Sequence, residues 1–237
     1  MEKNVLVTGA AGGLGMEIVK QHLKDGDKVW ALDLIMSTAM GECLYADRDI
    51  HRLCFLTCDI SSTEMVNEVL KTAHMPMENL DYIYSCAGIC RVEDRVPLED
   101  TDLDAITKVV DINAVGFLRV MKAVLPYIKT RTAILCVTSE AASIAENHRS
   151  QEFSYGMSKV AENMASVILQ RYFVEKGMST RVVCVHPGWL KTQMGGGDVA
   201  EVRPEDSAKA LCDIAKEIDH ISRETPFIDY QRKPIPW

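Results

Sequence analysis

The sequence has no surplus of positive charge, and this limits its partners. Its 237 residues carry 26 Lys and Arg against 34 Asp and Glu, a formal net charge of −8, and no Lys/Arg-rich run occurs. Nucleic acids and anionic membranes bind clustered positive charge, so neither is expected as a partner. No apolar stretch approaches the roughly 20 residues that cross a bilayer, and no charged-then-apolar leader precedes the first apolar segment. These absences predict a cytoplasmic protein.

Cysteine is present, but not in the arrangement of a metal site. Of the eight cysteines, Cys54 with Cys58 and Cys86 with Cys90 each have a spacing that could supply half of a zinc site. No His or Cys partners follow at finger-like spacing, so no metal site is predicted. Most of the cysteines lie in apolar runs, which favours buried, reduced thiols in a cytosolic protein.

The order of strand-like and helix-like segments indicates the fold. With 47% apolar and 25% charged residues, the chain has an ordinary soluble composition, and no linker or repeat divides it. A single domain over 1–237 is therefore predicted. Strands and helices alternate, which predicts an α/β fold: a doubly wound, mostly parallel sheet of about seven strands with helices on both faces. The expected strands are 5–7, 28–33, 53–58, 82–85, 133–138, 182–186 and 226–228. The expected helices are 13–24, one capped by Ser61 or Ser62, 102–128, 154–175 and 204–218, with room for a short one in 34–50.

A glycine-rich turn, Thr8-Gly9-Ala10-Ala11-Gly12-Gly13-Leu14-Gly15, joins the first strand to the first helix. Glycine lets the backbone approach a pyrophosphate closely, and the helix start directs free N–H groups and partial positive charge at it. The alternative is a tight connection that binds nothing. If the turn holds a dinucleotide, the contacts are Gly9, Gly12, Gly13, Leu14 and Gly15.

Acidic residues end the second and third strands. Asp33 can accept hydrogen bonds from the adenosine ribose hydroxyls and would repel a 2′-phosphate. No Arg or Lys occurs at 34–37, and Gly12 is neutral. This predicts NAD as cofactor, with NADP less favoured, and places Leu34 beside the ribose. Asp59 either meets the adenine amino group, next to Ile60, or caps the following helix; Asp33 is otherwise an ordinary strand-end residue.

Tyr155 and Lys159 are four residues apart, which places a phenol and an ammonium on one face of a helix. A free phenol, with a pKa near 10, is a poor base, and a nearby ammonium lowers that pKa. The pair therefore suggests an acid/base, although the same spacing also occurs in helices with one exposed Lys. Ser139 ends the fifth strand. Asn113, in an otherwise apolar helix, has either a buried partner or a solvent face.

Several motifs in order resemble those of the short-chain dehydrogenases/reductases: TGAAGGLG, Asp33, CDI, SCAG, DINAVG, Ser139, YGMSK and HPGWLKT. The resemblance runs from Met1 nearly to the end, with features of a carbonyl-reductase-like branch. It implies an NAD(H)-dependent oxidoreductase that interconverts a secondary alcohol and a ketone. It also implies the roles: Tyr155 is the general acid/base, Lys159 lowers its pKa and holds the nicotinamide ribose, Ser139 binds the substrate oxygen, and Asn113 holds a water.

The resemblance extends the expected cofactor site beyond the glycine turn. The further contacts it implies are Asp59, Ile60, Cys86, Ala87, Gly88, Tyr155, Lys159, Pro187, Gly188, Leu190 and Thr192. Cys86 departs from the family, which usually has an Asn there. Trp189, Met194 and three glycines suggest either a mobile lid over the substrate or a floppy loop. The polar segment 146–149 either edges the substrate pocket or is a solvated loop.

The expected partners are a small-molecule alcohol or ketone and a second copy of the chain. By resemblance, a homodimer or homotetramer forms through helices 102–128 and 154–175, and Ala161, Ala165, Ile168 and Leu169 face either that partner or the core. The alternative function is a non-catalytic dinucleotide-binding sensor or scaffold. The intact Ser139, Tyr155 and Lys159 argue against it.

Overall fold

The computed structural model describes residues 1–47, 51–73, 75–223 and 226–237. Its centre is a seven-stranded sheet in the order β3-β2-β1-β4-β5-β6-β7, with every neighbouring pair parallel. This confirms the predicted α/β fold. The strands are β1 Asn4–Thr8, β2 Lys28–Asp33, β3 Leu53–Thr57, β4 Leu80–Ser85, β5 Ile128–Val137, β6 Arg181–His186 and β7 Phe227–Asp229.

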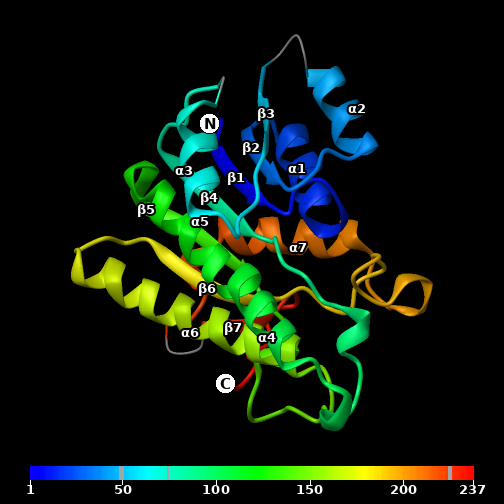
Figure 1. Cartoon of the computed structure of the whole chain (residues 1–237). Helices are drawn as coiled ribbons and strands as arrows, with labels where there is room; N and C mark the ends of the chain where they lie inside the picture. Colours follow the sequence, from blue (N-terminus) through cyan, green and yellow to red (C-terminus); the bar gives the residue numbers. More distant parts are fainter. Residues whose placement is uncertain (48–50, 74, 224–225) are drawn as a thin grey trace.

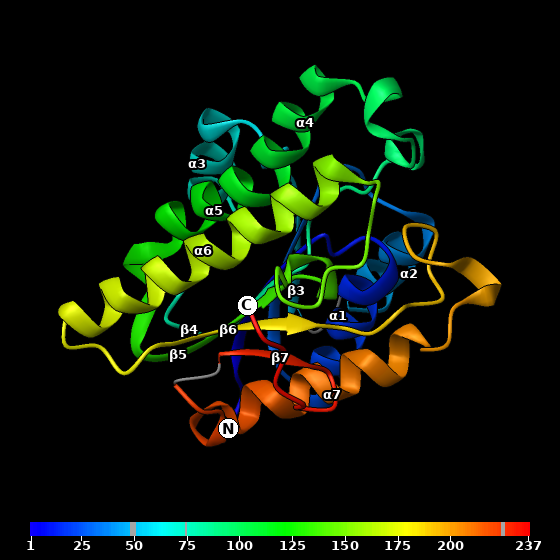
Figure 2. The ribbon, with the colours of Figure 1, turned by 90° about the horizontal axis from the view of Figure 1, so that it is seen from below.

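Helices cover both faces of the sheet (Figures 1 and 2). One face carries α1 (Gly13–Asp25), α2 (Thr38–Asp47) and α7 (Pro204–Lys216). The other carries α3 (Thr63–Lys71), α4 (Leu103–Val110), α5 (Gly116–Val124) and α6 (Phe153–Glu175). Short 3-10 turns occur at Val92–Asp94, Leu98–Asp100, Leu125–Tyr127, Glu140–Ala142, Gly197–Val199 and Ile218–His220.

The strands are apolar on both sides because both sides of the sheet are covered. Side chains alternate along a strand, so Val5 and Val7 of β1 pack into the core beneath α1 and α7. Leu6, between them, packs into the core beneath α5 and α6. All three are fully buried.

The predicted continuous helix 102–128 is wrong. The segment contains α4, a π-helical turn at Asp111–Val115, α5 and a 3-10 turn at Leu125–Tyr127, and β5 begins at Ile128. The π turn inserts an extra residue into the helical path, an irregularity often found at functional sites. Pro126 lacks a backbone N–H and ends the helical run.

Other helix ends follow the expected signals more closely. Ser62 caps α3, its Oγ accepting a hydrogen bond from the Met65 N–H at 3.2 Å. Pro204 occupies the first turn of α7, which ends at Lys216, two residues before the expected end. The segment 34–50 contains α2, although 48–50 lie outside the described residues. Within the described ranges, no helix combines the length and apolar character needed to span a bilayer.

The topology defines where a ligand can bind. Strand order runs outward from β1 through β2 to β3 and in the opposite direction from β4 to β7, so it reverses between β1 and β4. Ligands bind open α/β sheets at such a point, beyond the carboxyl ends of the strands. The glycine-rich turn after β1, Gly88 after β4 and Ser139 after β5 all lie at this edge.

The turn after β1 tolerates a side chain at one glycine and not at another. A Cβ on Gly15 would lie 2.1 Å from the Gly9 carbonyl oxygen, whereas a Cβ on Gly12 would meet nothing within 4 Å. We predict that Gly15→Ala lowers the free energy of unfolding by about 1–3 kcal/mol. The control, Gly12→Ser, introduces a favoured N-cap residue and changes it by less than about 0.5 kcal/mol. Urea unfolding followed by circular dichroism measures both. Equal midpoints for Gly15→Ala and the parent would contradict the crowding.

Candidate active site

The candidate acid/base pair lies at the start of α6, beside the end of β5. Lys159 is only 5% exposed, and its Nζ donates to the Val137 carbonyl at 3.0 Å and to Glu162 Oε2 at 2.7 Å. The same Nζ lies 5.9 Å from the centre of the Tyr155 ring. The ammonium is therefore near the phenol, but its hydrogen bonds are made to β5 and to Glu162.

Burial and charge act in opposite directions on this pair. Burial disfavours the Lys159 ammonium, but the Glu162 carboxylate outweighs it, so the pKa of Lys159 lies above its usual range. Burial raises the pKa of Tyr155, while Lys159 and Ser139 oppose the rise without cancelling it. The ammonium thus lowers the pKa of the phenol, as expected, but in the protein alone burial has the larger effect.

Ser139 follows β5 and is 6% exposed. Its Oγ donates to Glu140 Oε2 at 2.6 Å and accepts from the Ala141 N–H at 3.2 Å. Because a hydroxyl has one hydrogen, Ser139 presents a lone pair, not a donor, to anything else in this arrangement. Thr138, its neighbour, is buried at 3% exposure, as the alternation along the strand predicts.

Charged side chains connect Ser139 to the loop that precedes α6. Glu140 pairs with Arg149, and His186 Nδ1 lies 3.3 Å from Glu140 Oε2. Glu152 accepts from Arg149 Nε at 3.1 Å and from Arg95 Nε at 2.8 Å. Residues 144–151 are exposed and border a cavity of about 320 Å³ lined by Arg95 and 148–152. The loop is thus solvated but tied by ion pairs to the residue next to Ser139.

Asn113 lies in the π turn and is fully buried. Its Oδ1 accepts from the Ile89 N–H at 2.8 Å, and its Nδ2 donates to the Ile89 carbonyl at 3.0 Å and to Ser158 Oγ at 2.9 Å. The amide therefore fastens the segment after β4 to α6. A water held by Asn113 would have to use its main chain, and that role stays a prediction.

The glycine turn fits a dinucleotide pyrophosphate. A Cβ on Gly9 would lie 2.8 Å from the Ala87 nitrogen, so only glycine allows the turn to pack against the segment after β4. Gly12 and Gly13 are exposed at the start of α1, which has no side-chain cap. Uncapped N–H groups at a helix start are suited to an anion. Leu14 is buried in the core, so it can offer only its main chain.

Asp33 is held at the end of β2 by two backbone groups. Its Oδ2 accepts from the Ala11 N–H at 2.8 Å and its Oδ1 from the Leu34 N–H at 2.7 Å. Each carboxylate oxygen keeps a second lone pair, which a ribose hydroxyl could use. Among the described residues, no Lys, Arg or His forms an ion pair with Asp33.

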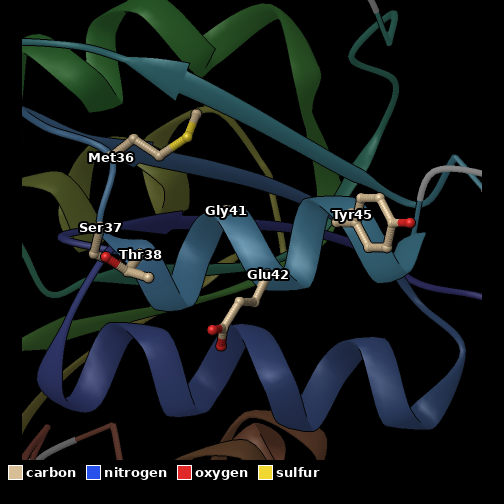
Figure 3. Close-up of a pocket in the computed structure, with 6 residues that line it drawn as sticks. All are labelled: Met36, Ser37, Thr38, Gly41, Glu42 and Tyr45. Atoms are coloured by element: carbon tan, nitrogen blue, oxygen red, sulfur yellow. The ribbon is translucent and has the colours of Figure 1, made fainter.

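A hollow of about 590 Å³ lies along α2, shortly after Asp33 in the chain. Figure 3 shows Met36 and Ser37 on the connection into α2, and Glu42 projecting from α2 on the side of α1. Its lining residues are Met36, Ser37, Thr38, Gly41, Glu42 and Tyr45. Among the described residues that line it, the only charge is the Glu42 carboxylate, and none of them offers a cation to a phosphate.

The remaining expected contacts are placed around the same edge. Asp59 Oδ1 accepts from the Ser61 N–H at 2.8 Å, and Ser61 keeps the pKa of Asp59 below its usual range. A Cβ on Gly116 would lie 2.8 Å from Ile60 Cδ1, so the Ile60 side chain is directed to α5. Cys86 is partly buried against the core, and the Ala87 N–H donates to Thr8 Oγ1 at 3.2 Å.

The loop after β6 is closed at its base. Lys191 and Val202 form a backbone hydrogen bond of 2.9 Å, and Val202 donates to the Trp189 carbonyl at 3.0 Å. Leu190 is buried, while Trp189 is 52% exposed.

A Cβ on Gly13 would lie 3.2 Å from Thr192 Cγ2, which places this loop against the glycine turn. Pro187 accepts from Ser207 Oγ, and Gly188 has a φ of +87°.

Sequence reasoning missed Glu140, Ser158 and Glu162. All three touch a residue that it had selected: Ser139, Asn113 and Lys159 respectively. A signal existed for Glu162, because it lies three residues after Lys159 on a helix, where opposite charges meet. No local pattern indicates that this face is buried.

The comparisons with known proteins agree with the fold. The family model for short chain dehydrogenase matches residues 3–202. The 1-hydroxy-2-glutathionyl-2-methyl-3-butene dehydrogenase of Rhodococcus sp. (strain AD45) is 27% identical, over 93% of this chain and 92% of that one. The 2-(R)-hydroxypropyl-CoM dehydrogenase of Xanthobacter autotrophicus is 27% identical, over 82% and 77% respectively. The crystal structure of an NADPH-bound carbonyl reductase from chicken fatty liver has a TM-score of 0.86 at 22% identity, covering 100% and 99% of the two chains.

The chain therefore belongs to the short-chain dehydrogenase family, whose members are oxidoreductases that use NAD or NADP. This confirms the predicted family. The likeness to a carbonyl reductase at 22% identity concerns the fold.

The Glu140 cluster predicts a pH-dependent stability. Burial acts to raise the pKa of Glu140, but Ser139, His186 and Arg149 together outweigh burial and lower that pKa to about 2. A carboxyl with a depressed folded pKa stabilises the fold above its unfolded pKa, and this contribution is lost as pH falls toward 2. Glu140→Gln should therefore be less stable than the parent at neutral pH, and the gap should shrink as pH falls below about 4.5.

Urea unfolding of both proteins at neutral pH and at steps down to about pH 3 measures the gap. Glu146→Gln, the same change at an exposed position of the same loop, is the control and should follow the parent throughout. A gap for Glu140→Gln that does not change with pH would contradict the ion-pair account.

Proposed function

We propose that the chain is an NAD(H)-dependent oxidoreductase that interconverts a secondary alcohol and a ketone, with Tyr155 as general acid/base. The observation that carries the proposal is the meeting of three side chains from two elements. Ser139, just after β5, lowers the pKa of Tyr155, and the Lys159 Nζ, one helical turn further along α6, lies 5.9 Å from the centre of the Tyr155 ring. A proton-transfer group, an oxygen-binding hydroxyl and a cation are thus gathered at the carboxyl edge of the sheet.

The chain's own residues would bind, orient and move one proton. In oxidation the Tyr155 oxygen takes the hydroxyl proton of the substrate, and in reduction it returns a proton to the carbonyl oxygen. Ser139 Oγ would position the substrate oxygen by turning its single hydrogen from Glu140 to that oxygen. Lys159 keeps one ammonium hydrogen beyond its two bonds and would hold the nicotinamide ribose with it. When bound, the nicotinamide accepts hydride from the alcohol carbon or returns it to the ketone carbon.

The relatives support an alcohol as substrate class. Both relatives described above are named as dehydrogenases of hydroxylated compounds, and one of these compounds, 2-(R)-hydroxypropyl-CoM, is a secondary alcohol. At 27% identity they support the reaction type and not the particular substrate. A non-catalytic sensor remains the competing function, and it has no use for the Ser139, Tyr155 and Lys159 arrangement.

The cofactor preference is proposed from Asp33. A 2′-phosphate on the adenosine ribose would meet a carboxylate, neutral Gly12 and the exposed apolar side chains of Leu34, Ile35 and Met36. Like charges at close range repel, so NAD is favoured over NADP. The carbonyl reductase with NADPH bound shares the fold at only 22% identity, so its cofactor does not decide the preference here.

Self-association through the outer helices stays a prediction. Ile168 is 58% exposed on α6, as are Met164 at 60% and Leu118 of α5 at 41%. Ala165 and Leu169, in contrast, pack against the core. Of the residues expected to face a partner or the core, Ile168 is thus free for a partner.

Removing the phenol oxygen tests the function. Tyr155→Phe should bind NADH as the parent does, because the ring remains, and should lose alcohol and ketone turnover by at least about 100-fold, because the proton donor is gone. NADH fluorescence titration measures binding, and a screen of secondary alcohols and ketones measures turnover. A parent that binds NADH but turns over none of them, like the variant, would support the sensor instead.

Changing the charge beside the ribose tests the cofactor. The parent should use NADH over NADPH by at least about tenfold in kcat/KM, about 1.4 kcal/mol. Asp33→Asn combined with Leu34→Arg should reverse the order, because a cation replaces the carboxylate. Asp33→Asn alone removes the carboxylate without adding a cation, so it should narrow the preference for NADH without reversing it. A parent that prefers NADPH would overturn the assignment.

A further inference from the structure

Glu162 is a fully buried carboxylate within hydrogen-bond distance of the candidate catalytic lysine. Its side chain has no exposed surface. One oxygen accepts from Lys159 Nζ at 2.7 Å, and the other accepts from Cys136 Sγ at 3.2 Å. An unpaired buried charge is strongly destabilising, so the carboxylate and the ammonium stabilise each other in the core. Nothing in the reaction proposed above requires a carboxylate at this position.

The pair lies among groups that are otherwise neutral. Cys136 of β5 and Cys86 and Cys90, which follow β4, are the titratable thiols nearby, and burial raises the pKa of all three. They therefore remain uncharged at neutral pH. Glu140, beside Ser139, is an anion that raises the pKa of Tyr155, and it is paired with Arg149. Lys159 is the charge that most lowers the pKa of Tyr155, and Glu162 is the anion in contact with that ammonium.

The Lys159 ammonium lies much closer to the Glu162 carboxylate than to the Tyr155 ring. The carboxylate is 2.7 Å from the ammonium, whereas the Tyr155 ring centre is 5.9 Å away. The negative charge in contact with the ammonium offsets part of its attraction for a phenolate, because Coulomb energies of opposite sign add.

We propose that Glu162 is a positioning residue: its carboxylate holds the Lys159 ammonium against the end of β5 and offsets part of that ammonium's charge at the Tyr155 hydroxyl. The consequence of this arrangement for catalysis rests on the proposed function. A phenol that stays protonated at neutral pH is a ready proton donor to a carbonyl, so the site is set for ketone reduction. Alcohol oxidation, which needs the phenolate, begins only at higher pH.

The test removes the charge of Glu162 and keeps its shape. Glu162→Gln retains an oxygen that accepts from Lys159, so the position of the ammonium is preserved while its compensation is lost. The pKa of Tyr155 should fall by about one pH unit or more. Near-ultraviolet phenolate absorbance during a pH titration reports this, taken as the difference between each protein and its Tyr155→Phe counterpart. In kinetics, the acidic limb of alcohol oxidation should move down by the same amount, which is about a tenfold gain in kcat/KM below the limb.

Two further variants separate charge from packing. Cys136→Ala removes the other partner of the carboxylate without changing its charge, so the Tyr155 titration should stay at the parent position. Glu162→Asp keeps the charge and should titrate like the parent, a rescue that a purely structural role would not produce. An unmoved titration in Glu162→Gln, or an equal shift in Cys136→Ala, would overturn the proposal.

If Glu162→Gln does not fold, the double variant Lys159→Gln with Glu162→Gln decides the matter. It removes a compensated pair, so Tyr155 should titrate within about half a pH unit of the parent. If the pKa of Tyr155 rises by more than one pH unit, Lys159 lowers that pKa in the parent without being offset by Glu162, which would contradict the proposal. The absorbance titration needs no turnover, so a parent without any alcohol or ketone activity would refute the proposed function while leaving the role of Glu162 to be decided separately.

Discussion

A buried ammonium needs partners, and the partners of Lys159 determine how the site is built. Its Nζ is bound to the last carbonyl of β5 and to Glu162, one turn further along the same helix. These contacts hold α6 to the sheet at the place where Ser139 emerges from β5. Because the ammonium cannot leave these acceptors without a large loss of free energy, Tyr155 is held beside Ser139 as well.

Two carboxylates accept hydrogen bonds from the candidate catalytic residues, and the family resemblance predicts neither of them. Glu140 takes the only hydrogen of Ser139, and Glu162 takes one of the three hydrogens of Lys159. In the proposed reaction, each would reduce the ability of its partner to stabilise negative charge on the reacting oxygens. The protein thus combines the usual donors with built-in acceptors, which favours a neutral, protonated Tyr155.

The cofactor end of the site is simpler, because main-chain geometry dominates it. Gly9 allows the turn to pack against the segment after β4, and Gly15 allows the start of α1 to pack against Gly9. Asp33 is held by backbone N–H groups on both oxygens. The carboxylate is therefore fixed in position before any ligand arrives. A fixed charge discriminates between a hydroxyl and a phosphate better than a mobile one, since it cannot turn away.

The amino-acid sequence by itself determined the alternation of strands and helices, the glycine turn and the one-face spacing of Tyr155 and Lys159, because these depend on local periodicity and backbone sterics. It also predicted the burial of Thr138 beside Ser139. It did not predict the π turn at Asn113, whose amide is paired with Ile89 and Ser158 from two other elements. Nor did it predict the net direction of the Tyr155 pKa. Only the tertiary structure decided these, because burial and the approach of Glu140 depend on which faces the packed helices and sheet bring together.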